Sequence, residues 1–142
     1  MGLLLYNGGT VCDDKFSNYS ADAICKNMGF YSASDWTSGS KWSQQSGYNI
    51  TLDNVVCSSS DWSSCTLTNA SSHNCDHSED VFLTCILSCP AGQYRSGGFC
   101  EQCPDNTYKA EAGIKTSCTS CPESSTSTAG STHCFCVAGK YW

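Results

Sequence analysis

Short alternations of apolar and polar residues in the first part of the chain predict a small fold with several strands. Residues 3–6, which are apolar, and Thr10-Val11-Cys12 lie on either side of Asn7-Gly8-Gly9, a turn that tolerates positive backbone angles. We therefore expect a hairpin here. Two more strands are predicted at residues 50–56, where apolar and polar positions alternate, and at residues 81–86.

One segment has the period of a helix. Apolar residues recur there at spacings of three and four between a capping serine and a terminating glycine. The residues concerned are Ser20 as N-cap, Ala21, Ile24, Cys25 and Met28, and Gly29 at the end. The pattern places Cys25 on the buried face, where it can crosslink the helix to another element.

Residues 31–49 show no clean period and are rich in Ser, Gly, Trp and Tyr. We expect an ordered loop in this segment. Large aromatic side chains in small domains are more often packed inside than displayed, so Trp36 and Trp42 are interpreted as core anchors.

The pattern changes after residue 87. Three Cys-Pro pairs, at Cys89, Cys103 and Cys121, each open a unit that contains few apolar residues. Such units cannot bury a core of their own, so they depend on crosslinks and on stacking against their neighbours. We expect two domains, residues 1–87 and 88–142, the second being an elongated, disulfide-stapled repeat with little regular structure.

Cysteine usage indicates the compartment. The chain has 13 cysteines in 142 residues, which is typical of a disulfide scaffold and of an extracellular protein, secreted or part of an ectodomain. Six are widely spaced and seven crowd the last third, so one is left over. Three glycosylation sequons, at Asn18, Asn49 and Asn69, agree with the secretory route.

Charge narrows the range of partners. Nine acidic residues and three lysines give residues 1–87 a net charge of −6, whereas four acids and four bases cancel in residues 88–142. The first part has no arginine, which argues against nucleic acid as a partner. No apolar run reaches the roughly 20 residues of a membrane span.

The first part resembles the scavenger receptor cysteine-rich (SRCR) domain. The resemblance rests on Gly9-Thr10-Val11-Cys12-Asp13-Asp14, on the helix at residues 21–29, on Leu52-Asp53-Asn54-Val55-Val56-Cys57, and on residues 73–80 with Cys85. It implies an α+β fold in which a small curved sheet cradles one helix. Phe30 stands where some members have another cysteine, so the six-cysteine type is implied, with the pairs Cys12–Cys75, Cys25–Cys85 and Cys57–Cys65.

The second part resembles the cysteine-rich repeats of the ephrin-receptor type, related in shape to EGF-like and tumour necrosis factor receptor modules. The Cys-Pro starts and residues 134–141 carry this resemblance. Sequential pairing would join Cys89–Cys100, Cys103–Cys118 and Cys121–Cys134. Cys136 is then unpaired, and we expect its partner beyond Trp142, in further domains of a longer protein of which this chain is a C-terminally truncated piece.

Three acids are candidates for a cation site. Asp13 and Asp14 adjoin Cys12, and the implied crosslink to Cys75 brings Glu79 near them. Converging carboxylates repel unless a cation or hydrogen bonds offset them, and the resemblance implies a calcium or magnesium site here that is used in ligand binding. The alternative is that the two aspartates cap turns and Glu79 is a solvated acid.

A second, weaker cation site is implied by the same resemblance. It consists of Asp53, Asn54 and Asn74. An asparagine at position 54, where the family often has an acid, lowers the charge of this ligand set.

Zinc and catalysis are disfavoured. The pairs Cys100/Cys103 and Cys118/Cys121 have the outward form of a zinc site, but the same cysteines fit the crosslinked repeat. His73 is expected to be structural or solvent-facing, as is His77. A paired-carboxylate hydrolase is conceivable, but no nucleophile motif is present and small disulfide modules seldom enclose a cleft, so we expect no enzyme.

Three functions remain open. We favour an extracellular recognition module whose bound cation bridges to a microbial surface, a glycan or a protein ligand. The alternative is a structural adhesion or spacer element of an extracellular matrix or cell-surface protein. A third is a regulatory appendage on an enzyme, such as a secreted protease.

Overall fold

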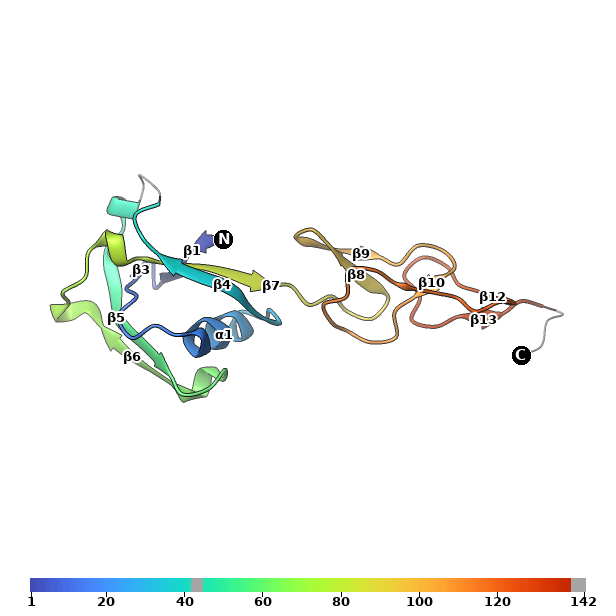
Figure 1. The fold of residues 1–142 in the computed structure, drawn as a ribbon, viewed down its shortest axis with the longest axis horizontal. Helices are drawn as coiled ribbons and strands as arrows, with labels where there is room; N and C mark the ends of the chain where they lie inside the picture. The colour runs from blue at the N-terminus through green and yellow to red at the C-terminus, as the bar shows by residue number, and fades with distance from the viewer. Residues whose placement is uncertain (42–44, 139–142) are drawn as a thin grey trace. The chain divides into compact units, whose positions relative to one another are not determined.

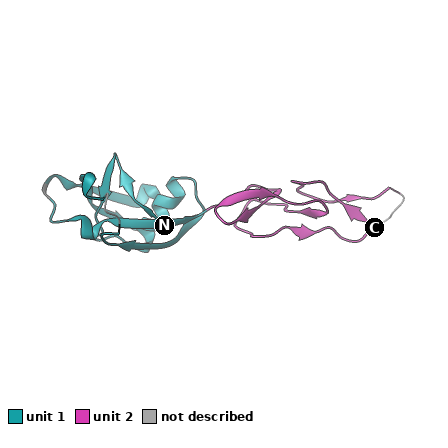
Figure 2. Cartoon of the chain, turned by 90° about the horizontal axis from the view of Figure 1, so that it is seen from above, with its two compact units in different colours: residues 1–86 teal, residues 87–142 magenta. Residues whose placement is uncertain are grey.

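The chain forms two compact units, residues 1–86 and 87–142, shown in Figures 1 and 2. The computed structural model describes residues 1–41 and 45–138. Each unit is considered by itself below.

The described residues of unit 1, 1–41 and 45–86, form two sheets and one α-helix. The four-stranded sheet has the order β2 (Leu5–Tyr6), β3 (Gly9–Val11), β5 (Ile50–Cys57) and β6 (Cys65–Asn69), and the three-stranded sheet has the order β1 (Gly2–Leu3), β7 (Val81–Ile86) and β4 (Ser32–Ser38). The β3–β5 pair is parallel and the other pairs are antiparallel. The expected hairpin is confirmed as β2–β3, and the α+β class is confirmed, although two sheets rather than one surround the helix.

The helix α1 (Asn18–Asn27) packs against β4, β5 and β7. It begins earlier than expected, because Ser17 is the N-cap and its side chain accepts a hydrogen bond from the backbone of Ser20. The prediction of Ser20 as N-cap is therefore wrong. Ser20 is buried and its hydroxyl donates to the carbonyl of Val55 at 2.7 Å, so it joins α1 to β5.

The prediction of a loop over residues 31–49 is wrong for its first half, where β4 pairs with β7 over its whole length. A register shift between Ala33 and Asp35 breaks the alternation that would reveal the strand. Trp36, on β4, is half-buried and meets Phe16 edge to face, with 4.8 Å between ring centroids. Trp42 lies outside the described residues.

Four short 3₁₀ helices connect these elements. They are η1 (Gln45–Gly47), η2 (Trp62–Ser64), η3 (Ala70–Ser72) and η4 (His77–Glu79). The last of them holds one of the candidate cation ligands.

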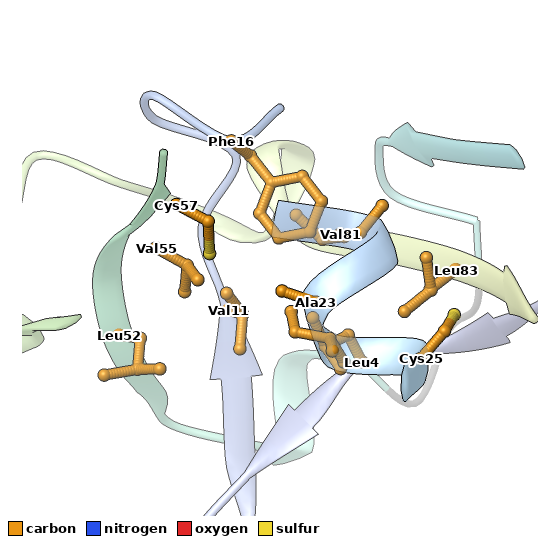
Figure 3. Packing of buried hydrophobic residues seen from close by; sticks show 12 residues of the cluster. Leu4, Val11, Phe16, Ala23, Cys25, Leu52, Val55, Cys57, Val81 and Leu83 are labelled. Carbon is orange, nitrogen blue, oxygen red and sulfur yellow. The ribbon is translucent and has the colours of Figure 1, made fainter. Parts of the chain in front are cut away.

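The core of unit 1 lies between α1 and the two sheets. Figure 3 shows Val11, Leu52 and Val55 from the four-stranded sheet, Ala23 from α1, and Val81 from β7. All five are at most 1% exposed. Burying each large aliphatic side chain contributes on the order of 1.5–3 kcal/mol, so unit 1 has a conventional apolar interior.

Three disulfides crosslink unit 1. Cys25–Cys85 joins α1 to β7 and Cys57–Cys65 closes the β5–β6 hairpin. Cys12–Cys75 spans 63 residues and ties the end of β3 to the segment before η4. These are the pairs that the family resemblance implies.

Unit 2, residues 87–142, is a succession of two-stranded ladders (Figure 2). They are β8 (Gln93–Ser96) with β9 (Phe99–Gln102), β10 (Thr107–Tyr108) with β11 (Thr119–Ser120), and β12 (Ser125–Thr126) with β13 (Phe135–Cys136). The disulfides are Cys89–Cys100, Cys103–Cys118 and Cys121–Cys134, as sequential pairing implies. Cys136 is free and exposed.

Backbone hydrogen bonds connect neighbouring repeats of unit 2. Gly92 donates to the carbonyl of Lys109, and its own carbonyl accepts from Cys103. Lys109 is 5% exposed, and its ammonium donates to the carbonyls of Cys89 and Pro90 at 3.1 and 3.2 Å. The repeats therefore stack through main-chain groups and one buried cation.

Candidate cation and ligand site

The candidate site lies where the chain leaves β3. Cys12 forms an isolated antiparallel bridge with Asp80, and the backbone N–H of Asp13 donates to the carbonyl of Glu79 at 2.9 Å. This pairing, reinforced by the Cys12–Cys75 disulfide, holds residues 12–14 beside η4. The acids of the two segments are thereby brought side by side.

One oxygen each of Asp13, Asp14 and Glu79, together with the sulfur of Cys12, lie within 4.8 Å of one another. An ion midway between two oxygens 4.8 Å apart is about 2.4 Å from each, which is a normal calcium distance. All three acids are half-buried. The structure thus brings together the three residues that the sequence singled out, and the all-oxygen donor set fits a hard cation such as calcium or magnesium.

The second candidate site is not separate from the first. Asp53, Asp14 and the sulfurs of Cys12 and Cys75 also lie within 4.8 Å of one another. Asp14 therefore belongs to both groups. The sulfurs cannot serve as thiolate ligands, because they are joined in a disulfide. We call the four carboxylates, Asp13, Asp14, Asp53 and Glu79, the acidic cluster.

The other two residues of the second site lie at the margin of the acidic cluster. Asn54 donates through its side-chain nitrogen to Oδ2 of Asp53 at 2.7 Å, which orients that carboxylate. Oδ1 of Asn74 is 3.9 Å from the sulfur of Cys75. Asn54 thus acts on a neighbouring carboxylate, a role that its residue type alone does not reveal.

A capping box fixes Glu79. Asp76 caps η4 by accepting from the backbone of Ser78, and Oε2 of Glu79 accepts from the backbone N–H of Asp76 at 2.9 Å. The hydrogen bonds from Ser78, side chain first and backbone second, lower the pKa of Asp76. One oxygen of Glu79 is held by this contact, which restricts the orientation of the carboxylate.

A buried polar group beside the site was missed at the sequence level. Asp80 is fully buried, and its Oδ2 lies 2.8 Å from Nδ1 of His77 and accepts from the amide of Gln45 at 2.9 Å. His77 is therefore a structural partner, and His73 accepts from the backbone of Cys75. No sequence pattern signals Asp80, because its partners lie on segments brought in by the fold.

The remaining candidates are placed as follows. All four cysteines with the spacing of a zinc site, Cys100, Cys103, Cys118 and Cys121, form disulfides. They therefore offer no thiolate to a metal. The three sequon asparagines, Asn18, Asn49 and Asn69, are exposed. Among the described residues, no helix is long and apolar enough to cross a membrane.

Unit 1 is a small α+β fold crosslinked by three disulfides, with four acids gathered near the end of β3. A family model of the scavenger receptor cysteine-rich domain matches residues 4–86. The chain therefore belongs to this family, whose domain is an extracellular ligand-binding module.

Individual relatives match over part of the chain. Lysyl oxidase homolog 2 of Xenopus laevis is 42% identical over 79 residues, which cover 54% of this chain and 10% of the relative. Lysyl oxidase homolog 3B of Danio rerio is 40% identical over 86 residues, covering 58% of this chain and 10% of that protein. The chain thus spans about a tenth of the length of these curated relatives.

A solved structure also matches. It is the dimeric form of the SRCR domain of mouse MARCO, with 32% sequence identity and a TM-score of 0.44, covering 59% of this chain and 84% of that one.

Proposed function

We propose that unit 1 is a ligand-recognition module in which a divalent cation, calcium or magnesium, bound at the acidic cluster bridges to anionic groups of a partner. The supporting observation is the convergence of four carboxylates, none of which forms a salt bridge with a lysine or arginine among the described residues. Within residues 1–41 and 45–138, the contact between His77 and Asp80 involves no lysine or arginine, and the acidic cluster therefore has no ion-paired base.

The charge balance favours a cation-dependent mode of binding. Unit 1 carries a net charge of −6, and an anionic ligand approaching the bare acidic cluster would be repelled. A bound divalent ion reverses the local sign and leaves coordination positions for oxygens of the ligand. Sulfated or phosphorylated glycans, microbial surface polymers and acidic protein segments have this chemistry.

Calorimetric titration of calcium into the whole chain tests the cation site. We expect saturable binding that Asp14→Asn weakens at least about tenfold, because Asp14 contributes to both groups of the cluster. Asp61→Asn is the matched control, since Asp61 is exposed and makes no side-chain capping bond. Absence of binding, or equal binding by both variants, would refute the cation site.

A second experiment separates recognition from a purely structural role. Immobilised sulfated polysaccharide should retain the chain in calcium and release it when a chelator is added. An adhesion or spacer element without a ligand of its own would be unretained under both conditions. The spacer alternative draws support from unit 2, whose charges cancel.

The relatives support a second candidate function, as an appended module of an enzyme. The two relatives compared above are named lysyl oxidase homologs, and only a tenth of each is matched. We propose that unit 1 performs no chemistry itself and that, in a longer protein, it would direct or regulate an enzymatic part elsewhere. Fusing the chain to a reporter enzyme and comparing its retention on matrix with that of the Asp14→Asn fusion tests this role.

Unit 2 is proposed to be a set of ephrin-receptor-like repeats serving as a stalk. Its support is the succession of Cys-Pro starts, each followed by a short ladder. Cys136 would then pair with a cysteine further along a longer chain, and peptide mapping of a longer product under non-reducing conditions would detect that bond.

A further inference from the structure

Unit 1 has a polar cavity whose lining includes no residue of the acidic cluster. It measures about 400 Å³, lies between α1 and β4, and is lined by Asn18, Ala21, Asp22, Ala33, Ser34, Asp35 and Trp36. This volume is within the range of ~300–1,000 Å³ typical of small-ligand pockets. The lining combines one large aromatic ring with two carboxylates, a hydroxyl and an amide.

One lining residue is the asparagine of a glycosylation sequon. Asn18 is the first residue of α1 and is exposed. Its Oδ1 accepts a hydrogen bond from Nε1 of Trp36 at 2.9 Å. The indole N–H can only donate, so the partner must be the amide oxygen. The amide orientation is thereby fixed, and Nδ2, the atom to which a glycan is attached, is left for substitution.

We propose that the cavity is the seat of the first N-acetylglucosamine of a glycan on Asn18. An N-glycan leaves the amide oxygen unchanged, so the bond from Trp36 persists in the modified protein. The first sugar then starts at the wall of the cavity, next to the Trp36 ring. Sugar rings have apolar C–H faces that pack on aromatic rings, and their hydroxyls and acetamide N–H donate to carboxylates.

The backbone prepares the other contacts. The register shift between Ala33 and Asp35 is a bulge, and bulges re-aim the side chains beside them. Asp35 is exposed and lines the cavity, so its carboxylate can accept from a sugar. Asp22 already accepts hydrogen bonds from the backbone of Ala33 at 2.7 Å and from the hydroxyl of Ser60 at 3.2 Å. It therefore shapes the cavity but is not the main acceptor for a sugar.

The modification itself must occur before α1 packs. Glycan transfer joins Nδ2 of Asn18 to the anomeric carbon of the sugar and breaks that carbon's bond to the pyrophosphate of a lipid-linked donor, which leaves with the electron pair while the amide loses one proton. The transferring enzyme must also reach the sequon serine. Ser20 is fully buried in the fold, with its hydroxyl committed to Val55.

Native deglycosylation tests the seat. The chain is produced in a secretory eukaryotic host, and an amidase that cleaves the Asn–sugar bond is applied without denaturant. Mass spectrometry follows the loss of glycan at each sequon. We expect release at Asn18 to be about tenfold slower than at Asn69, which lies at the end of β6 with an exposed Ser71 in its sequon. Denaturation should equalise the rates.

Variants identify the contacts responsible. Asp35→Ala should accelerate release at Asn18 and leave Asn69 unchanged, whereas Asp61→Ala, an exposed acid outside the cavity lining, should alter neither. Rates at Asn18 and Asn69 that are equal in the native chain would overturn the proposal. So would an Asn18 that carries no glycan when Asn69 is occupied.

The order of events has its own test. Unglycosylated chain is refolded with its disulfides formed and then offered to an oligosaccharyltransferase with a lipid-linked donor. Asn69 should be modified and Asn18 should not, whereas the reduced, unfolded chain should accept glycan at both. Modification of Asn18 in the folded chain at the rate of Asn69 would contradict the burial argument.

Discussion

Units 1 and 2 contain three disulfides each, but the residues buried around these bonds differ between the two units. The apolar cluster draws its members from unit 1 (Figure 3), where α1 packs against strands of both sheets. In unit 2 the buried residues include Cys89, Cys103, Lys109 and Ser127, whose side chains end in sulfur or a polar group. Disulfides therefore add to a core in unit 1 and replace one in unit 2.

This difference matters for function. A packed core holds the acidic cluster in place, because the β3–β5 pairing and the Cys12–Cys75 bond fix residues 12–14 and 53 relative to η4. Unit 2 has short ladders joined by backbone hydrogen bonds. It is suited to extend a chain rather than to build a rigid site.

Removing one disulfide from unit 1 and, in a second variant, one from unit 2 should give the largest difference in stability between the two units. Cys103→Ala/Cys118→Ala opens a 15-residue closure in unit 2, and Cys57→Ala/Cys65→Ala opens one of 8 residues in unit 1. The entropy model gives similar costs, about 3 kcal/mol for 15 residues and slightly less for 8. The described residues of unit 2 form no apolar core that could offset this cost. Unit 2 should therefore unfold while unit 1 stays folded.

Hydrogen exchange resolved by peptide measures both units in one chain. In the first variant, peptides from residues 87–138 should lose protection while those from residues 1–86 keep it. In the second, β5 and β6 should stay protected, because Cys57 and Cys65 face each other in an intact ladder. Equal loss in the two units would show that the comparison is wrong.

A glycine substitution should test the main-chain stacking in unit 2. Gly92 has φ of 78°, and a Cβ there would lie 2.2 Å from the carbonyl oxygen of Gly130. Gly97 also has positive φ, 58°, but faces open space. Gly92→Ala should therefore cost more than Gly97→Ala, roughly 1–3 kcal/mol more. Denaturant unfolding of unit 2 measures the difference, and equal midpoints would contradict close stacking.

The sequence predicted elements whose signals are local. The hairpin, the helix and the strand at residues 81–86 follow from turn chemistry and periodicity, and all three are present. β4 was missed because its bulge interrupts the alternation. The N-cap cannot be predicted from local sequence, because both Ser17 and Ser20 suit the position. The contact that distinguishes them, Ser20 with Val55, spans 35 residues.

The candidate site, too, is predictable from the sequence in some of its residues and not in others. Asp13, Asp14 and Glu79 could be grouped because an implied crosslink and adjacency in sequence bring them together. That Asp14 is shared with Asp53 depends on the parallel pairing of β3 with β5, which no local pattern encodes. The Asp80 contacts with His77 and Gln45 likewise depend on segments that meet only in the folded chain.

The smallest expected effect concerns the buried ammonium of unit 2. Burial first, and the charge of Lys115 second, lower the pKa of Lys109 below 10.5. The unfolded chain therefore binds more protons than the folded one as pH approaches 10.5 from below. Stability should rise with pH in that window, by a few tenths of a kcal/mol up to roughly 1 kcal/mol.

Lys109→Met should abolish this rise, and the difference between the two chains isolates Lys109 from other groups. Tyr94 is one such group, because its hydrogen bond to Glu101 raises its pKa above 10.0, so its contribution is present below pH 10 and is lost above it. Unfolding midpoints between pH 8 and 10 measure the slope. If the wild-type chain and Lys109→Met have equal slopes, the ammonium of Lys109 is hydrated in the folded chain. Backbone hydrogen bonds, without the ammonium, would then hold the repeats of unit 2 together.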